Sequence, residues 1–99
     1  MSAGADVGRA LEGSGWFAVR CMFSIGAFSA PRARGYEERI TLWRAGSFEA
    51  AVEMAEAEAS QYAATVPDLE TEYLGLAQAL RLFDDPDHGA EVFSLMRRG

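Results

Sequence analysis

Cysteine and histidine are nearly missing from this 99-residue sequence, which holds one of each, Cys21 and His88. A single cysteine cannot form an intramolecular disulfide, and within an apolar strand it is usually a small buried hydrophobic residue. One cysteine and one histidine are also too few for a Cys/His metal cluster. His88 lies in the acidic turn Asp84–Gly89, where a solvated turn is a far commoner role than a metal site. We therefore expect no metal ion and no cofactor.

Long apolar runs and an excess of basic charge are lacking as well. Charged residues interrupt every apolar run, whereas a transmembrane helix needs about 20 consecutive apolar residues. The net charge of -6 makes the protein acidic and provides no basic surface for nucleic acid phosphates. The start of the chain has no apolar h-region of a signal peptide. We expect no membrane span, no nucleic acid partner and a cytoplasmic location.

Motifs of the common enzyme classes are missing too, because the sequence contains neither a Gly-rich phosphate loop nor a nucleophile elbow. The length suffices for one hydrophobic core. Residues 1–15 combine four glycines with small residues and mixed charge. We predict that they form a disordered tail and that residues 16–99 form a single domain.

What is present begins with two candidate strands. Trp16–Ser24 is rich in aromatic and β-branched residues and is too short for a typical helix, so it is predicted to be a strand. Glycine and proline then make Ile25–Gly35 a long hairpin loop. Tyr36–Arg44 is predicted to be the second strand, with Ile40 and Leu42 marking its core side.

The clearest periodic signal follows Gly46, where Ser47 is placed to cap a helix. From Phe48 the apolar residues repeat at spacings of three and four, and glutamates line the opposite side. Pro67 cannot extend the helix and disfavours the helical conformation at the residue before it. The helix is therefore expected to end near Ala64.

The last third of the chain is harder to assign. Glu72–Phe83 fits a strand or a helix by its periodicity, and Gly75 in its interior favours the strand. Asp84–Gly89 has the composition of a turn, and Ala90–Arg97 is predicted to be a final strand. The expected fold is α+β, a short antiparallel sheet of about four strands in ββαββ order with one amphipathic helix on one face.

Both faces of such a sheet would be apolar, although one helix covers only one of them. Burying even 400 Å² of apolar surface contributes roughly 10 kcal/mol before the cost of association. We therefore expect a partner on the open face, either a second copy in a homodimer or another protein. The alternative is that the N-terminal tail or the Ile25–Gly35 loop folds over this face.

The strongest polar group consists of residues that could converge on the sheet. Glu37 and Arg39 share one face, and Glu91 would join them if the second and fourth strands were neighbours. These three residues would then form a ligand-binding pocket, or the site of a small enzyme, together with Arg20. Trp43 would form one wall of this pocket. Cross-strand ion pairs, with Trp43 as a core or dimer contact, are the commoner role of such residues. A binding or accessory module that catalyses nothing is the favoured hypothesis.

Four segments together resemble the domain-of-unknown-function 4288 family. These are WFAVRCMF (16–23), YEERITLWRAGSFEAAVEMAEAEASQYA (36–63), EYLGLAQALRLFD (72–84) and GAEVFSLMR (89–97). YEERITLWRA and EVFS are the most specific parts, since the Ala/Glu helix would match many unrelated proteins. The resemblance implies the domain bounds and the strand at Glu72–Phe83, and it implies nothing about mechanism.

Overall fold

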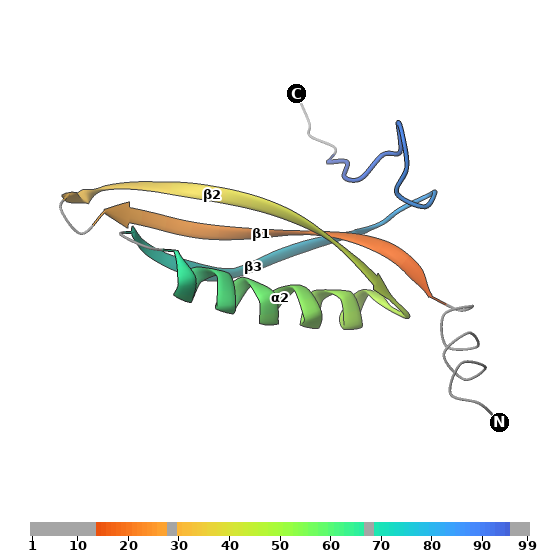
Figure 1. Cartoon of the computed structure of the whole chain (residues 1–99), viewed down its shortest axis with the longest axis horizontal. Coiled ribbons are helices and arrows are strands. Elements are labelled where there is room, and N and C mark those ends of the chain that lie inside the picture. The colour runs from red at the N-terminus through yellow and green to blue at the C-terminus, as the bar shows by residue number, and fades with distance from the viewer. Residues whose placement is uncertain (1–13, 28–29, 67–68, 96–99) are drawn as a thin grey trace.

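The computed structural model describes residues 14–27, 30–66 and 69–95, so the predicted N-terminal tail lies almost wholly outside the described residues. The described chain is α+β, with one helix packed on an antiparallel sheet of three strands (Figure 1). The elements follow the order ββαβ: β1 (Gly15–Ala27), β2 (Ala30–Ala45), α2 (Phe48–Thr65) and β3 (Leu69–Arg81).

The sheet has the order β2-β1-β3, so β1 is its central strand and is antiparallel to both neighbours. Phe17, Val19 and Phe23 of β1 face α2 and are almost fully buried. On the opposite face of β1, Ala18 is also fully buried. This central position explains why the strand is apolar on both sides.

Helix α2 packs its alanines against β1, and Ala51, Ala55 and Ala59 are buried there. Their short side chains let the helix backbone approach the sheet closely. Ser47 caps the helix, since its hydroxyl accepts a hydrogen bond from the amide of Ala50 at 3.1 Å. The predicted helix is confirmed, and it ends at Thr65, one residue beyond the expected position.

The predicted fourth strand is wrong over the residues that the structure describes. Ala90–Leu95 has no regular secondary structure, and Met96 and Arg97 lie outside the described residues. The alternation of apolar residues there is typical of a strand, but a strand also needs a neighbour with free backbone groups in the right place. The order is therefore ββαβ and not ββαββ.

The predicted long hairpin loop over Ile25–Gly35 is also wrong. β1 continues to Ala27, β2 begins at Ala30, and these two residues are paired in the sheet. Pro31 falls within β2. A proline is tolerated there because β2 is an edge strand, whose outer backbone groups need no partner.

The predicted core side of the second strand is reversed. Ile40 and Leu42 lie on the face away from α2 and are 46% and 39% exposed. The face of β2 towards α2 carries Arg39 and Trp43. Apolar residues mark the buried side of a strand when that side packs on an apolar surface. At the edge of this sheet, β2 meets polar side chains of the helix, so its apolar residues lie on the other side.

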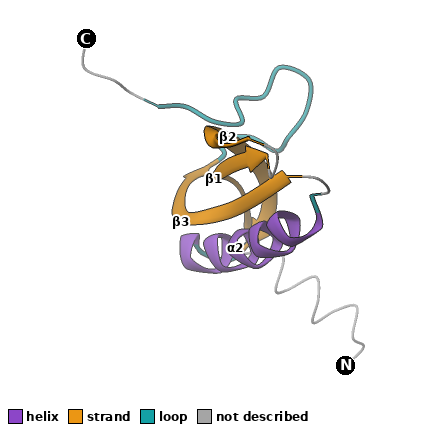
Figure 2. Cartoon of the chain, turned by 90° about the vertical axis from the view of Figure 1, so that its left-hand side faces the viewer, coloured by secondary structure: helices purple, strands orange, loops and turns teal. Residues whose placement is uncertain are grey.

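The face of the sheet away from α2 is called the open face below, and the residues after β3 cover one end of it. Residues 82–95, the C-terminal segment, lie on the opposite side of the sheet from α2 (Figure 2). The segment starts at Leu82, whose amide donates a hydrogen bond to the carbonyl of Trp16 at 2.8 Å. Further along, the ring centroid of Phe93 lies 5.5 Å from the guanidinium carbon of Arg20. Of the two segments considered from the sequence, Ile25–Gly35 forms parts of β1 and β2, and the N-terminal tail lies outside the described residues.

Candidate functional site

The sheet separates the five residues that the sequence suggests as a ligand site. Arg20 lies on the open face, where it meets the side chain of Gln78. Glu37, Arg39 and Trp43 lie on the face covered by α2. Glu91 is exposed in the C-terminal segment. Because the described chain has no fourth strand beside β2, these side chains do not form a single pocket.

Arg39 and Glu37 connect β2 to the helix. Nη1 of Arg39 donates a hydrogen bond to Oε1 of Glu58 at 2.8 Å, and its guanidinium carbon lies 3.6 Å from the ring centroid of Tyr62. The Tyr62 hydroxyl donates to Oε1 of Glu37 at 2.6 Å, and this hydrogen bond is the main cause of the raised pKa of Tyr62. A stacked arginine with a carboxylate partner holds two elements together well. The group therefore has a structural role.

Trp43 also has a structural partner in the described chain. Its indole nitrogen donates a hydrogen bond to Oγ1 of Thr41 at 2.6 Å. Its ring packs against the buried cluster between β1 and α2. Of the two roles considered from the sequence, the structure favours the core contact over the wall of a ligand pocket.

The solitary cysteine lies in the same core, away from solvent. Cys21 is buried, and burial raises its pKa, so the thiol stays protonated near neutral pH. Burial also raises the pKa of neighbouring Tyr73, and the hydrogen bond from its hydroxyl to Glu56 raises it further. The raised pKa values therefore keep Cys21 and Tyr73 protonated near neutral pH.

On the open face, Arg20 is a largely buried cation. Its side chain is 16% exposed, it donates to the Gln78 amide oxygen, and Nη1 lies 3.7 Å from a carboxylate oxygen of Glu38. Among the described residues, its Nε atom has no hydrogen-bond partner. A buried guanidinium nitrogen without a partner costs free energy.

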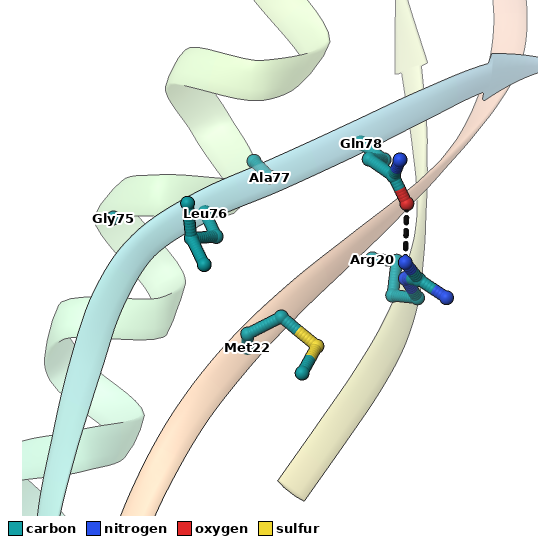
Figure 3. A pocket seen from close by; sticks show the side chains of 6 residues that line it. All are labelled: Arg20, Met22, Gly75, Leu76, Ala77 and Gln78. Atoms are coloured by element: carbon teal, nitrogen blue, oxygen red, sulfur yellow. Dashed lines mark hydrogen bonds between the residues drawn. The ribbon is translucent and has the colours of Figure 1, made fainter. Parts of the chain in front are cut away.

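A pocket of about 390 Å³ lies beside Arg20 (Figure 3). Arg20, Met22, Leu76 and Gln78 line it with side chains from β1 and β3. The pairing of these strands is irregular here, since the register advances two residues along β1 but four along β3. The bulge contains Gly75, whose φ of 73° favours glycine. Met22, Leu76 and Gln78 are not among the site residues predicted from the sequence, although Gly75 inside an alternating strand is a signal of an irregularity there.

Exposed apolar side chains surround the pocket on the same face. Ile40 and Leu42 of β2 lie on this face. So do Tyr36 of β2, which is 73% exposed, and Leu76 of β3, which is 60% exposed. Met22 lies between the two strands on β1. These five residues are called the open-face patch below. Apolar residues grouped in this way on a small domain typically mark an interaction surface.

Comparison with known proteins finds no match to this chain. No protein-family model, no curated protein and no solved structure matches it. The resemblance to the domain-of-unknown-function 4288 family therefore stays a prediction. In the part of the chain that the structure describes, no helix is long and apolar enough to cross a membrane. Those residues likewise contain no group of three His, Cys, Asp or Glu side chains arranged to hold a metal ion.

Proposed function

We propose that this chain is a small binding or accessory protein that acts as a homodimer through the open face of its sheet. The observation that carries the proposal is the open-face patch, in which Ile40, Leu42 and Leu76 expose apolar surface on a single layer. The described C-terminal segment lies over one end of this layer (Figure 1). Burying the rest against a second molecule supplies the free energy for association.

The charges on the open face favour a second copy as the partner. Arg20 and Arg44 lie on this face together with Glu38 and Glu72, so both signs are present side by side. In a two-fold interface the same surface meets itself, so a face that carries both signs allows arginines of one copy to meet glutamates of the other. A face of one sign would repel its copy, as the net charge of -6 does over the chain as a whole.

The experiment places a charge within the open-face patch. Ile40→Glu buries a carboxylate in the proposed interface, and we expect it to yield monomers where the unaltered chain is dimeric. Met54→Glu is the matched control, because Met54 lies on α2, is 37% exposed and undergoes the same change of charge. Light scattering gives the mass of each variant, and circular dichroism shows that each is folded. Dimers of equal strength for both variants would reject the open face as the interface.

A second candidate function rests on the pocket beside Arg20. Its apolar lining and the polar side chains of Arg20 and Gln78 suit a small molecule with an apolar part and a hydrogen-bond acceptor. Leu76→Trp would fill the pocket. Native mass spectrometry of the protein purified from its own cells would then show an added mass on the unaltered chain and not on the variant. The absence of any added mass on the unaltered chain would count against this candidate.

A further inference from the structure

The last described residues have the sequence of a strand without its structure. Residues 90–95 read AEVFSL, with Val92, Phe93 and Leu95 supplying the apolar and aromatic side chains that strands favour. Within the described chain, the amides of residues 91–95 donate no backbone hydrogen bond, and the preceding turn is closed by Ala90 donating to Asp87 at 2.9 Å. A segment of this composition gains free energy by pairing with the free edge of a sheet.

Leu82 anchors the start of the segment, being 7% exposed, whereas several apolar side chains beyond it stay partly or fully exposed. Phe93 lies over Arg20 at 5.5 Å, a cation–π contact on a partly covered surface. Val92 and Leu95 remain 40% and 41% exposed, and Phe83 is 98% exposed. If the segment leaves the open face, the partial burial of Val92, Phe93 and Leu95 is lost, and pairing with a second copy has to replace it. Its departure also uncovers the end of that face which it blocks.

Of the two free edges of the sheet, β2 is the better acceptor. β2 pairs with β1 without interruption from Gly15↔Ala45 to Gly26↔Arg34, so its backbone is regular over this length. β3 carries the bulge at Gly75, and α2 makes more of its contacts with β3 than with either other strand. Bulges and a covering helix both hinder the addition of a strand to an edge.

The charges of the C-terminal segment and of the two edge strands also favour β2. The C-terminal segment contains three aspartates, one glutamate and no arginine, whereas β2 contains four arginines and two glutamates. β3 contains two glutamates and one arginine, so its net charge has the same sign as that of the segment. An acidic segment is therefore attracted to β2 and repelled by β3.

From these observations we propose that the C-terminal segment of one copy pairs as a strand with the β2 edge of a second copy, and that the exchange is reciprocal. This inference rests on the homodimer proposed above and adds the element that the two copies exchange. Each sheet then has four strands, one of them from the partner. The exchange also clears each open face for packing against the other.

Hydrogen exchange combined with light scattering tests the inference on the full chain. A strand added at an edge turns every second amide towards its neighbour, so we expect alternate amides among Glu91–Leu95 to exchange at least about tenfold more slowly at concentrations where the chain is dimeric than where it is monomeric. A dimer whose Glu91–Leu95 amides exchange as fast as in the monomer would overturn the exchange and leave the homodimer standing. A chain that stays monomeric would overturn both proposals.

Proline substitutions supply an independent test. Consecutive amides of a strand point to opposite sides, so one of the two variants Glu91→Pro and Val92→Pro removes an amide that faces β2. We expect that variant to weaken the dimer by about tenfold or more. Val92→Thr is the control, since threonine keeps the amide and the branched side chain of a strand residue. If neither proline variant weakens the dimer relative to Val92→Thr, the exchange is rejected.

Discussion

At the scale of single residues, Arg39 is the side chain that most directly ties β2 to the helix. It combines a hydrogen-bonded ion pair with Glu58 and a position over the ring of Tyr62. Both charged partners are only partly exposed, so removing one leaves the other poorly solvated. We expect Arg39→Ala to lower the free energy of unfolding by about 2 kcal/mol, measured by urea denaturation.

Arg44→Ala is the control for this prediction. Arg44 lies on the same strand but is exposed. At a concentration where the chain is monomeric, we expect its replacement to change the free energy of unfolding by less than about 0.5 kcal/mol. Equal effects of the two variants would contradict the role given to Arg39.

The buried thiol and phenol predict how stability depends on pH. Burial raises the pKa values of Cys21 and Tyr73 above their ordinary values of 9.0 and 10.0. The folded chain therefore keeps protons that the unfolded chain loses, and this contribution to stability is complete below about pH 9 and declines at higher pH. We expect urea denaturation to show a falling free energy of unfolding above that pH.

Tyr73→Phe isolates the phenol in that pH dependence. The variant has no hydroxyl to ionise at this position, so we expect the free energy of unfolding to decline less steeply around pH 10. The variant is also less stable at neutral pH, because Glu56 loses its hydrogen-bond partner. A decline as steep as that of the unaltered chain would show that the alkaline loss has another source.

At the scale of elements, the bulge in β3 shapes the pocket beside Arg20. Gly75 adopts a φ of 73°, which a residue with a Cβ atom seldom adopts, although open space surrounds the site. We expect Gly75→Ala to destabilise the fold by about 1 kcal/mol because of backbone strain alone. Gly35→Ala is the matched control, since Gly35 also has open space and has no positive φ. Thermal denaturation of both variants checks this, and equal melting temperatures would contradict it.

Some elements could be predicted from the sequence because their signals are local. Ser47 and the alanine spacing define α2, and Gly75 favours a strand over a helix in the stretch that became β3. The errors arose where the outcome depends on neighbours. Ala90–Leu95 has strand composition without a strand partner, and Ile40 and Leu42 are apolar residues on the uncovered side of an edge strand.

The candidate site was harder to predict than the fold. The alternation of side chains along the second strand predicts that Glu37, Arg39 and Trp43 share one face, and the structure has them on one face. The alternation does not tell which of the two faces α2 covers. The sequence suggests Arg20 as a site residue. Its neighbours Leu76 and Gln78 belong to β3, and no local sequence pattern shows that β3 lies beside β1 in the sheet. Strand order depends on long-range pairing, which is invisible to local periodicity.

At the scale of the whole molecule, the account depends on how the open face of a three-stranded sheet is covered. One helix and the C-terminal segment leave the open-face patch exposed, and the charges beside it suit a second copy. The molecular mass of the purified, unaltered chain tests this most directly, measured by sedimentation equilibrium from low micromolar to near-millimolar concentration. We predict a rise from 10.7 kDa to twice that mass as concentration increases. A mass that stays at 10.7 kDa across the whole range would contradict the account.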